Sequence, residues 1–382
     1  MKKNAMICSL TDTILAIIFV FTIFLPLIGS LLDWDLVDDL GEKRLLADCP
    51  AFLKDPVRTI PDKFEAFYKD RFGFRNGLIK GHNWIRYRLC KGSSLGKVLF
   101  GKDDWLFLTK AGIINDFLGQ NPLTENELEL WKEVLEQRQQ WLQKWGIRYL
   151  FIIAPNKTTI YPEMLPDHIQ SSRGRSRMDQ LMEYLRDHST VEFLDLREPL
   201  WRAKSTGLLY HQTDTHWTDR GGFGAYLEIS KSVAQWFPDI QHLRIDNFST
   251  SIQNQQGDLA VMLGLGEELA EELETFQFRK PQEAFYVDFV INAKYPNLQQ
   301  ILNNNKFATE NKNGVYRLLF LHDSFGEHGK LREYLCETFS RSICLPVTLD
   351  YSFLKSITEQ EKPDIVIEEI AERKLKDIPF PD

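Results

Sequence analysis

Two short segments of the chain carry side-chain types that together could perform acyl transfer. The first, TDTHW at residues 213–217, puts the carboxylate of Asp214 two positions before the imidazole of His216. The second, HDSF at residues 322–325, puts the hydroxyl of Ser324 shortly after an apolar run. A serine attacks an acyl carbon when a base takes its proton, and the base works best when a carboxylate holds its ring. We therefore treat Ser324, His216 and Asp214 as the candidate nucleophile, base and orienting acid.

These segments need a scaffold that brings them together, and the chain predicts a layered one. Apolar runs of strand length, which suit strands buried on both faces, lie at 149–154, 191–196, 317–321, 342–347 and 363–368. Segments with helical spacing or helix-capping residues separate them, at about 124–146, 178–186, 219–236 and 326–339. Strands that alternate with helices predict an α/β fold with a mainly parallel sheet.

The position of Ser324 in this pattern favours a site at one edge of the sheet. In open α/β sheets, sites form beyond the carboxyl ends of the strands. Ser324 follows a predicted strand and precedes a predicted helix. We expect backbone N–H groups of that turn, together with the positive end of the helix, to stabilise an oxyanion.

Each of these residues also has a plainer interpretation. Ser324 could simply cap a helix, and Asp214 could be a turn residue. His211 lies close to Asp214 and His216 and raises the possibility of a metal site, but a catalytic metal normally needs three protein ligands and no further Cys or His group completes this one. The sequence contains no CxxC pair, so it does not indicate a structural zinc site. We predict neither a metal nor a cofactor.

Length and charge narrow the possible classes of protein. The chain has 382 residues, enough for one large domain or two ordinary ones, and we place the catalytic domain at residues 98–382. Within it, the irregular stretch from about 240 to 313 is interpreted as an insertion. The net charge of −8 makes nucleic acid an unfavourable partner. Cys49, Cys90, Cys336 and Cys344 could form up to two disulfides in an oxidising compartment.

The amino-terminal segment predicts a membrane anchor. Residues 13–32 contain no charged side chain and are long enough to span a bilayer as a helix. Lysines precede the run and aspartates follow it, so we expect residues 1–12 in the cytoplasm and residues 33–97 as a membrane-proximal spacer outside it. We therefore expect a single-pass protein of the inner membrane, with its catalytic domain in the periplasm or otherwise outside the cytoplasm. A cleaved signal peptide is the alternative.

Several segments together resemble a known family, the SGNH-like O-acetyltransferases that modify bacterial exopolysaccharides such as alginate. The matching segments are 68–75, 101–107, 160–166, 213–217, 257–260 and 363–373. The resemblance implies a three-layer SGNH-hydrolase-like fold, and a triad whose residues here are Asp214, His216 and Ser324. It also implies a polysaccharide acceptor and a membrane-bound O-acyltransferase as the source of acetyl groups. The expected activity is O-acetyl transfer through a serine nucleophile.

The chain departs from simple SGNH hydrolases at the nucleophile, where His322 stands in place of the glycine of a Gly-Asp-Ser motif. The usual oxyanion donor is therefore not assignable, and Asn156, beyond the first core strand, is only a geometric candidate for a second one. Two alternatives remain open from the sequence. One is a carbohydrate esterase with the same triad and water as acceptor, and the other is a non-catalytic glycan-binding assembly protein.

Overall fold

A seven-stranded sheet forms the centre of the molecule, in the order β5-β4-β12-β10-β11-β9-β8. The computed structural model describes residues 2–32, 46–52, 54–89, 94–289, 307–347 and 351–377. Five neighbouring strands are parallel: β5 (Phe193–Asp195), β4 (Arg148–Ala154), β12 (Ile365–Ala371), β10 (Arg317–His322) and β11 (Arg341–Pro346). All five predicted strands are present, with shifted ends.

The sheet is nevertheless mixed, which corrects the expectation of a mainly parallel one. Strands β9 (Phe307–Glu310) and β8 (Phe285–Tyr286) extend one edge in antiparallel pairing. Two smaller antiparallel sheets stand beside it, one of β1 (Ser94–Leu95), β2 (Val98–Phe100) and β3 (Leu106–Leu108), the other of β6 (Phe248–Gln255) and β7 (Glu271–Phe278). These strands are short or polar on one face, so their sequences lack the continuous apolar runs that mark a buried parallel strand.

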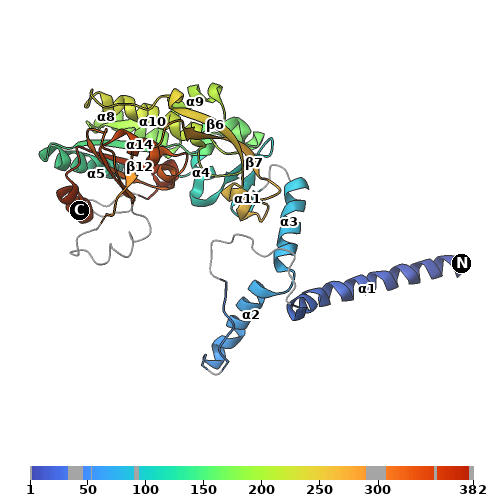
Figure 1. Cartoon of the computed structure of the whole chain (residues 1–382). Helices are drawn as coiled ribbons and strands as arrows, with labels where there is room; N and C mark the ends of the chain where they lie inside the picture. Colours follow the sequence, from blue (N-terminus) through green and yellow to red (C-terminus); the bar gives the residue numbers. More distant parts are fainter. Residues whose placement is uncertain are drawn as a thin grey trace.

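Helices cover both faces of the sheet, which gives three layers (Figure 1). One apolar cluster joins strand residues such as Phe151 and Leu319 to α5 (Glu125–Lys144), α8 (Arg177–His188) and α15 (Tyr351–Glu361). The other joins their strand neighbours, such as Ile152 and Phe320, to α9 (Arg197–Ala203), α10 (Asp219–Ala234) and α14 (Leu331–Thr338). Successive side chains of a strand point to opposite faces, so each central strand serves both clusters.

Local sequence signals account for where the helices begin and end. Thr124 and Glu127 form the predicted capping box at the start of α5. The single helix expected over 326–339 is instead split into α13 (Ser324–Glu327) and α14. The break falls at Gly329 and Lys330, which both have positive φ. A Cβ at Gly329 would lie 2.6 Å from the Trp217 ring, so only glycine fits there.

Shorter helices complete the main body, and three helices precede it. The short ones are α4 (Ile113–Phe117), α6 (Lys157–Ile160), α7 (Asp167–Gln170) and α11 (Asp258–Met262). Figure 1 shows α1 (Lys2–Leu32), α2 (Ile60–Arg71) and α3 (Arg75–Leu89) lying outside the main body. Within the part of the chain that the structure describes, no helix combines the length and apolar character needed to cross a membrane. The span predicted over residues 13–32 is therefore not supported.

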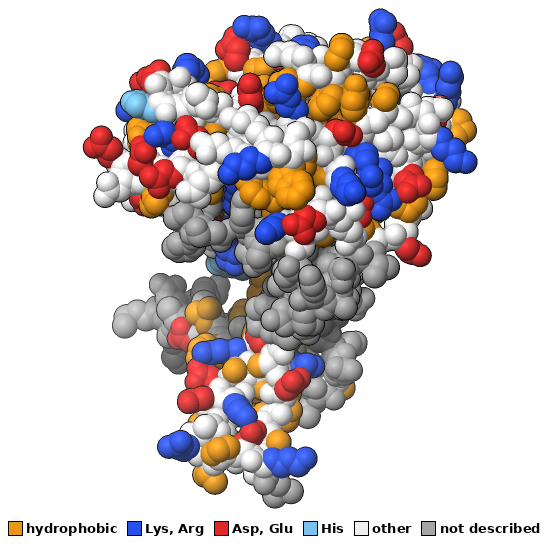
Figure 2. Space-filling view, turned by 90° about the vertical axis from the view of Figure 1, so that its left-hand side faces the viewer, with side chains coloured by type: hydrophobic (Ala, Val, Ile, Leu, Met, Phe, Trp, Pro, Cys, Tyr) orange, Lys and Arg blue, Asp and Glu red, His pale blue; other side chains and the backbone are white. Residues whose placement is uncertain are grey.

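The surface carries mixed charge, and the described cysteines are not paired. On the face shown in Figure 2, basic and acidic side chains are interspersed and leave no continuous patch of one sign. Cys49, Cys336 and Cys344 are free thiols, so no disulfide joins them, and Cys90 lies outside the described residues.

Candidate active site

The candidate base lies on a loop without regular secondary structure, residues 211–217, which we call the base loop. Because its backbone has no ladder of its own beyond the bridge between Tyr210 and Trp217, side chains from elsewhere must hold its polar groups. The carboxylate of Glu271, on β7, accepts hydrogen bonds from the N–H groups of Gln212 and Thr213 at 2.8 and 3.1 Å, and from the Thr213 hydroxyl at 2.7 Å.

A buried lysine and a second carboxylate complete this support. The ammonium of Lys157 donates to three loop carbonyls, those of His211, Gln212 and Asp214, at 3.0, 3.1 and 2.6 Å. Burial lowers the pKa of Lys157 to about 8 despite the acidic groups around it. Asp258, at the start of α11, accepts from the backbone N–H and the hydroxyl of Thr215 at 2.8 and 2.9 Å.

Within the loop, one carboxylate oxygen of Asp214 orients the ring of His216, and the other holds Asp214 itself in place. One oxygen accepts from Nδ1 of His216 at 2.8 Å and from the backbone N–H of His216 at 2.9 Å. The other accepts from the backbone N–H of Asp258 at 2.7 Å. With Nδ1 donating to Asp214, the tautomer that fits this network leaves Nε2 as an acceptor. Burial alone would raise the pKa of Asp214, but the hydrogen bond and charge of His216 hold it well below its ordinary value.

The candidate nucleophile is the first residue of α13, two residues after the last residue of β10, and we call residues 322–328 the nucleophile turn. Two carboxyl groups support its backbone. Asp323 accepts from the N–H of Phe325 at 2.9 Å and from the N–H of Ala371 at 2.8 Å. Glu369, on β12, accepts from the N–H of Asp323 and of Gly326, both at 3.1 Å. The turn is thus tied to the next strand of the sheet.

This support corrects one expectation about the oxyanion. The N–H groups of Phe325 and Gly326, which follow the serine, already donate to carboxyl groups. Helix α13 also has only four residues, so it lacks the aligned peptides of a longer helix. The turn therefore does not offer the N–H groups of Phe325 and Gly326 to an oxyanion.

The base loop and the nucleophile turn meet at their functional side chains. The hydroxyl of Ser324 lies 2.9 Å from Nε2 of His216, across 108 positions of sequence. The structure thus brings Asp214, His216 and Ser324 into one hydrogen-bonded chain, as the sequence predicted. A hydroxyl hydrogen-bonded to an imidazole that a carboxylate orients is the arrangement of groups required for serine nucleophilic catalysis.

Two further side chains approach this chain of hydrogen bonds, and sequence reasoning missed both. Nη2 of Arg373 lies 3.1 Å from the Ser324 hydroxyl. The ring of His328 stacks on that of His216 with centroids 3.7 Å apart and planes within 5°. Burial, then the nearby His216, lowers the pKa of His328. Arg373 closes the matching segment 363–373, which was the one sequence signal that pointed toward it.

The backbone N–H of Asn156 and the indole of Trp217 have structural roles. The backbone N–H of Asn156 donates to Glu372 at 2.7 Å and is not free for an oxyanion. Burial raises the pKa of Glu372 to about 7. Trp217 is fully buried, and its indole N–H donates to the carbonyls of Phe325 and His328 at 3.1 and 2.9 Å. Trp217 thus packs in the core and joins the base loop to the nucleophile turn.

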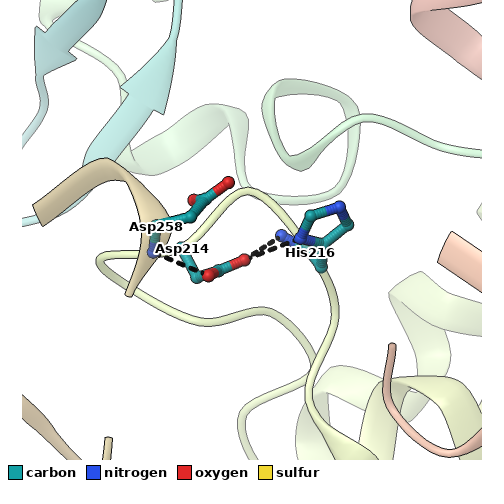
Figure 3. Close-up of side chains that lie close together, drawn as sticks. All are labelled: Asp214, His216 and Asp258. Carbon is teal, nitrogen blue, oxygen red and sulfur yellow. Dashed lines mark hydrogen bonds and ion pairs between the residues drawn. The ribbon is translucent and has the colours of Figure 1, made fainter. Parts of the chain in front are cut away.

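Figure 3 shows the side chains in which a metal site could be sought, Asp214, His216 and Asp258. One potential ligand atom of each lies within 4.8 Å of the others. The oxygens of Asp214 already accept from His216 and from the Asp258 N–H, and both oxygens of Asp258 accept from the Thr215 hydroxyl. His211 is not part of this group, since its ring faces Glu271 at 3.7 Å. The arrangement fits an oriented imidazole better than a cation.

Comparison with known proteins agrees with this geometry. Residues 98–286 match the family described as "SGNH hydrolase-like domain, acetyltransferase AlgX". The resemblance to SGNH-like O-acetyltransferases is thereby confirmed. The matched residues include Asp214 and His216 and end before Ser324.

Individual relatives extend the comparison. The probable alginate O-acetylase AlgJ of Pseudomonas syringae is 29% identical over 178 residues, which cover 46% of this chain and 42% of that protein. The protein of the same name from Pseudomonas aeruginosa is 24% identical over 232 residues, covering 58% and 55%. The chain thus spans about half the length of the curated relatives it matches. The structure of Bacillus cereus PatB1 superposes with a TM-score of 0.52 at 17% identity, covering 73% of this chain and 96% of that one, and supports the SGNH-like α/β fold.

Proposed function

We propose that this protein transfers acetyl groups onto hydroxyls of an exopolysaccharide, with Ser324 as nucleophile, His216 as general base and Asp214 as its orienting acid. The observation that carries the proposal is the continuous path from Asp214 through both ring nitrogens of His216 to the Ser324 hydroxyl, at 2.8 and 2.9 Å. The relatives named as alginate O-acetylases support the choice of acetyl group and of a polysaccharide acceptor.

The reaction takes two steps that share the same groups. Nε2 of His216 takes the proton of Ser324 as its oxygen bonds to the carbonyl carbon of an acetyl donor, and the leaving group departs with that proton. An acetyl-serine results. A sugar hydroxyl then gives its proton to His216 and attacks the acetyl carbon, and Ser324 regains a proton as the ester leaves. The Asp214 carboxylate stabilises the imidazolium that forms in each step.

The experiment pairs a chromogenic acetyl ester with an oligosaccharide acceptor. We expect Ser324→Ala to reduce both ester turnover and glycan acetylation on the order of 10³-fold or more. The control is Ser205→Ala, at an exposed serine of a short 3-10 helix, which should leave both unchanged.

Two results would contradict the proposal in different ways. Rapid ester turnover without any acetylated glycan would favour a carbohydrate esterase, in which water takes the place of the sugar hydroxyl. Full activity of the Ser324→Ala variant would remove the serine mechanism altogether and favour a non-catalytic glycan-binding role.

We further propose that the reaction takes place outside the cytoplasm and that a membrane-bound O-acyltransferase delivers the acetyl groups. The relatives are named as alginate O-acetylases, and an exopolysaccharide acceptor outside the cytoplasm supports this location. Activated acetyl donors are cytoplasmic, so an external acceptor requires delivery across the membrane. A carboxyl-terminal fusion to a reporter that is active only in the cytoplasm should be silent, and a strong signal would reverse the assignment.

A further inference from the structure

The nucleophile has a cationic neighbour whose function the triad does not explain. Nη2 of Arg373 donates to the Ser324 hydroxyl at 3.1 Å, while that hydroxyl also faces Nε2 of His216 at 2.9 Å. Ser324 can therefore accept from the arginine and donate to the histidine at the same time. A cation at this distance favours the negative charge that grows on the serine oxygen when His216 removes its proton.

The other terminal nitrogen of this guanidinium is unused. Nη1 of Arg373 is buried and has no hydrogen-bond partner among the described residues. Leaving a buried charged donor unpaired is costly, so such an atom in a native structure calls for an explanation. The ring of Phe325 lies against the guanidinium at 5.1 Å, and within the described part of the chain no carboxylate forms an ion pair with it. Its charge remains available to an incoming anion.

Several candidate oxyanion donors are absent or already engaged at the same place. His322 replaces the expected glycine, the N–H groups of Phe325 and Gly326 donate to carboxyl groups, and the N–H of Asn156 donates to Glu372. Nη2 lies 3.1 Å from the Ser324 hydroxyl, so an oxygen on the carbon bonded to that hydroxyl oxygen comes within its reach. The guanidinium fork suits an oxygen anion in two-point contact.

We propose that Arg373 is a catalytic residue that stabilises the oxyanion of the tetrahedral intermediate and the forming serine alkoxide. When the serine oxygen bonds to the acetyl carbon, the carbonyl π electrons move onto its oxygen, and the guanidinium donates hydrogen bonds to that oxygen. The serine proton goes to His216, and the guanidinium gains and loses none. This inference rests on the proposed function for the identity of the acyl group, not for the attack by Ser324.

The test compares Arg373→Gln and Arg373→Lys with the parent on a small neutral acetyl ester, without glycan. Removing one oxyanion donor costs about 10²- to 10³-fold in kcat, so we expect a loss of that size with glutamine and a smaller one with lysine, with KM nearly unchanged. The exposed Arg202, paired with Glu198 on α9, provides the matched control: Arg202→Gln should leave kcat unchanged.

Chemical rescue separates catalysis from structural support. Added guanidinium, at concentrations too low to unfold the protein, should restore part of the kcat of an Arg373→Ala variant and leave Arg202→Ala unaffected. In the Arg373 variants, the rate at which a sulfonyl fluoride inactivates Ser324 should fall in parallel with kcat. This inactivation needs no acceptor. It therefore reports on Arg373 even if no glycan is ever acetylated and the proposed function fails.

Two outcomes would overturn the inference. Unchanged kcat on the neutral ester, with a raised KM only for an anionic glycan, would make Arg373 a binder of substrate carboxylates. A loss of activity that follows a loss of folded protein, without rescue by guanidinium, would make it a structural residue.

Discussion

The base loop and the nucleophile turn are both held by buried carboxyl groups, but the two regions favour opposite charge states. In the base loop, burial acts to raise the pKa of Glu271, yet the nearby His211 ring and hydrogen bonds from Thr213 and the Gln212 N–H hold it below its ordinary value. In the nucleophile turn, burial and then the nearby charge of Asp323 raise the pKa of Glu369 well above its ordinary value. The first group is an anion at neutral pH, and the second favours its protonated form.

The difference follows from what each region must stabilise. In the proposed reaction, negative charge near the base loop favours the imidazolium that forms on His216. Asp323 already places a negative charge next to Ser324, and a second one on Glu369 would further oppose the alkoxide and the oxyanion of the proposed reaction. A neutral Glu369 can still accept the N–H groups of Asp323 and Gly326 without adding such a charge. Replacing each acid by its amide therefore distinguishes the two regions.

The larger effect is expected in the base loop, for Glu271→Gln. The carboxylate uses one oxygen for the Gln212 N–H and the other for both donors of Thr213. The glutamine side chain has one acceptor oxygen, and its NH2 group would face a backbone N–H that has lost its acceptor. We therefore expect a loss of about 2–3 kcal/mol in the free energy of unfolding at pH 7. Denaturant unfolding measures it, and activity should fall as His216 loses its position.

The pH dependence and a neighbouring residue sharpen this prediction. The folded-state pKa of Glu271 is depressed, so its contribution to stability is present above the ordinary pKa of a glutamate and is lost as pH falls through the folded value. Parent and variant should therefore converge in acid. Glu272→Gln, at the next and exposed position of β7, should have no effect at any pH. Equal stability of Glu271→Gln and the parent at pH 7 would show that the loop does not depend on this anion.

The sequence predicted the parts of the site that depend on local patterns. Asp214 and His216 share one short segment, and Ser324 follows a strand whose apolar run is unmistakable, so their types and positions indicated the triad. Arg373 and His328 carry no such pattern, because an arginine and a histidine near strand or helix ends are ordinary surface residues until the fold places them. The same holds for Glu271 and Asp258, which lie in the stretch interpreted as an insertion and hold the base loop through contacts distant in sequence.

The fold shows the same division. Continuous apolar runs predicted the five parallel strands because burial on both faces leaves a strong signature. The edge strands β8 and β9 have only two and four residues, too few for a period to be visible, and their antiparallel pairing was missed. The break between α13 and α14 was missed because Gly329 is dictated by its contact with the Trp217 ring.

The smallest effect, of the opposite sign, is expected for Glu369→Gln. The raised folded-state pKa of Glu369 means that its contribution to stability is full below the ordinary pKa of a glutamate and is lost as pH rises through the folded value. The amide oxygen can accept from Asp323 and Gly326, and the amide nitrogen replaces Oε1, which has no partner among the described residues. The variant should therefore be at least as stable as the parent at pH 7 and should keep most of its activity.

Glu369→Ala is the control, because it leaves the N–H groups of Asp323 and Gly326 without their acceptor. It should lose about 1–3 kcal/mol in the free energy of unfolding, measured by the same denaturant titration. If the glutamine variant loses as much stability as the alanine variant, Glu369 is an anion in the folded protein. A second negative charge, beside that of Asp323, would then lie beneath the nucleophile, and the demand on the guanidinium of Arg373 would be correspondingly greater.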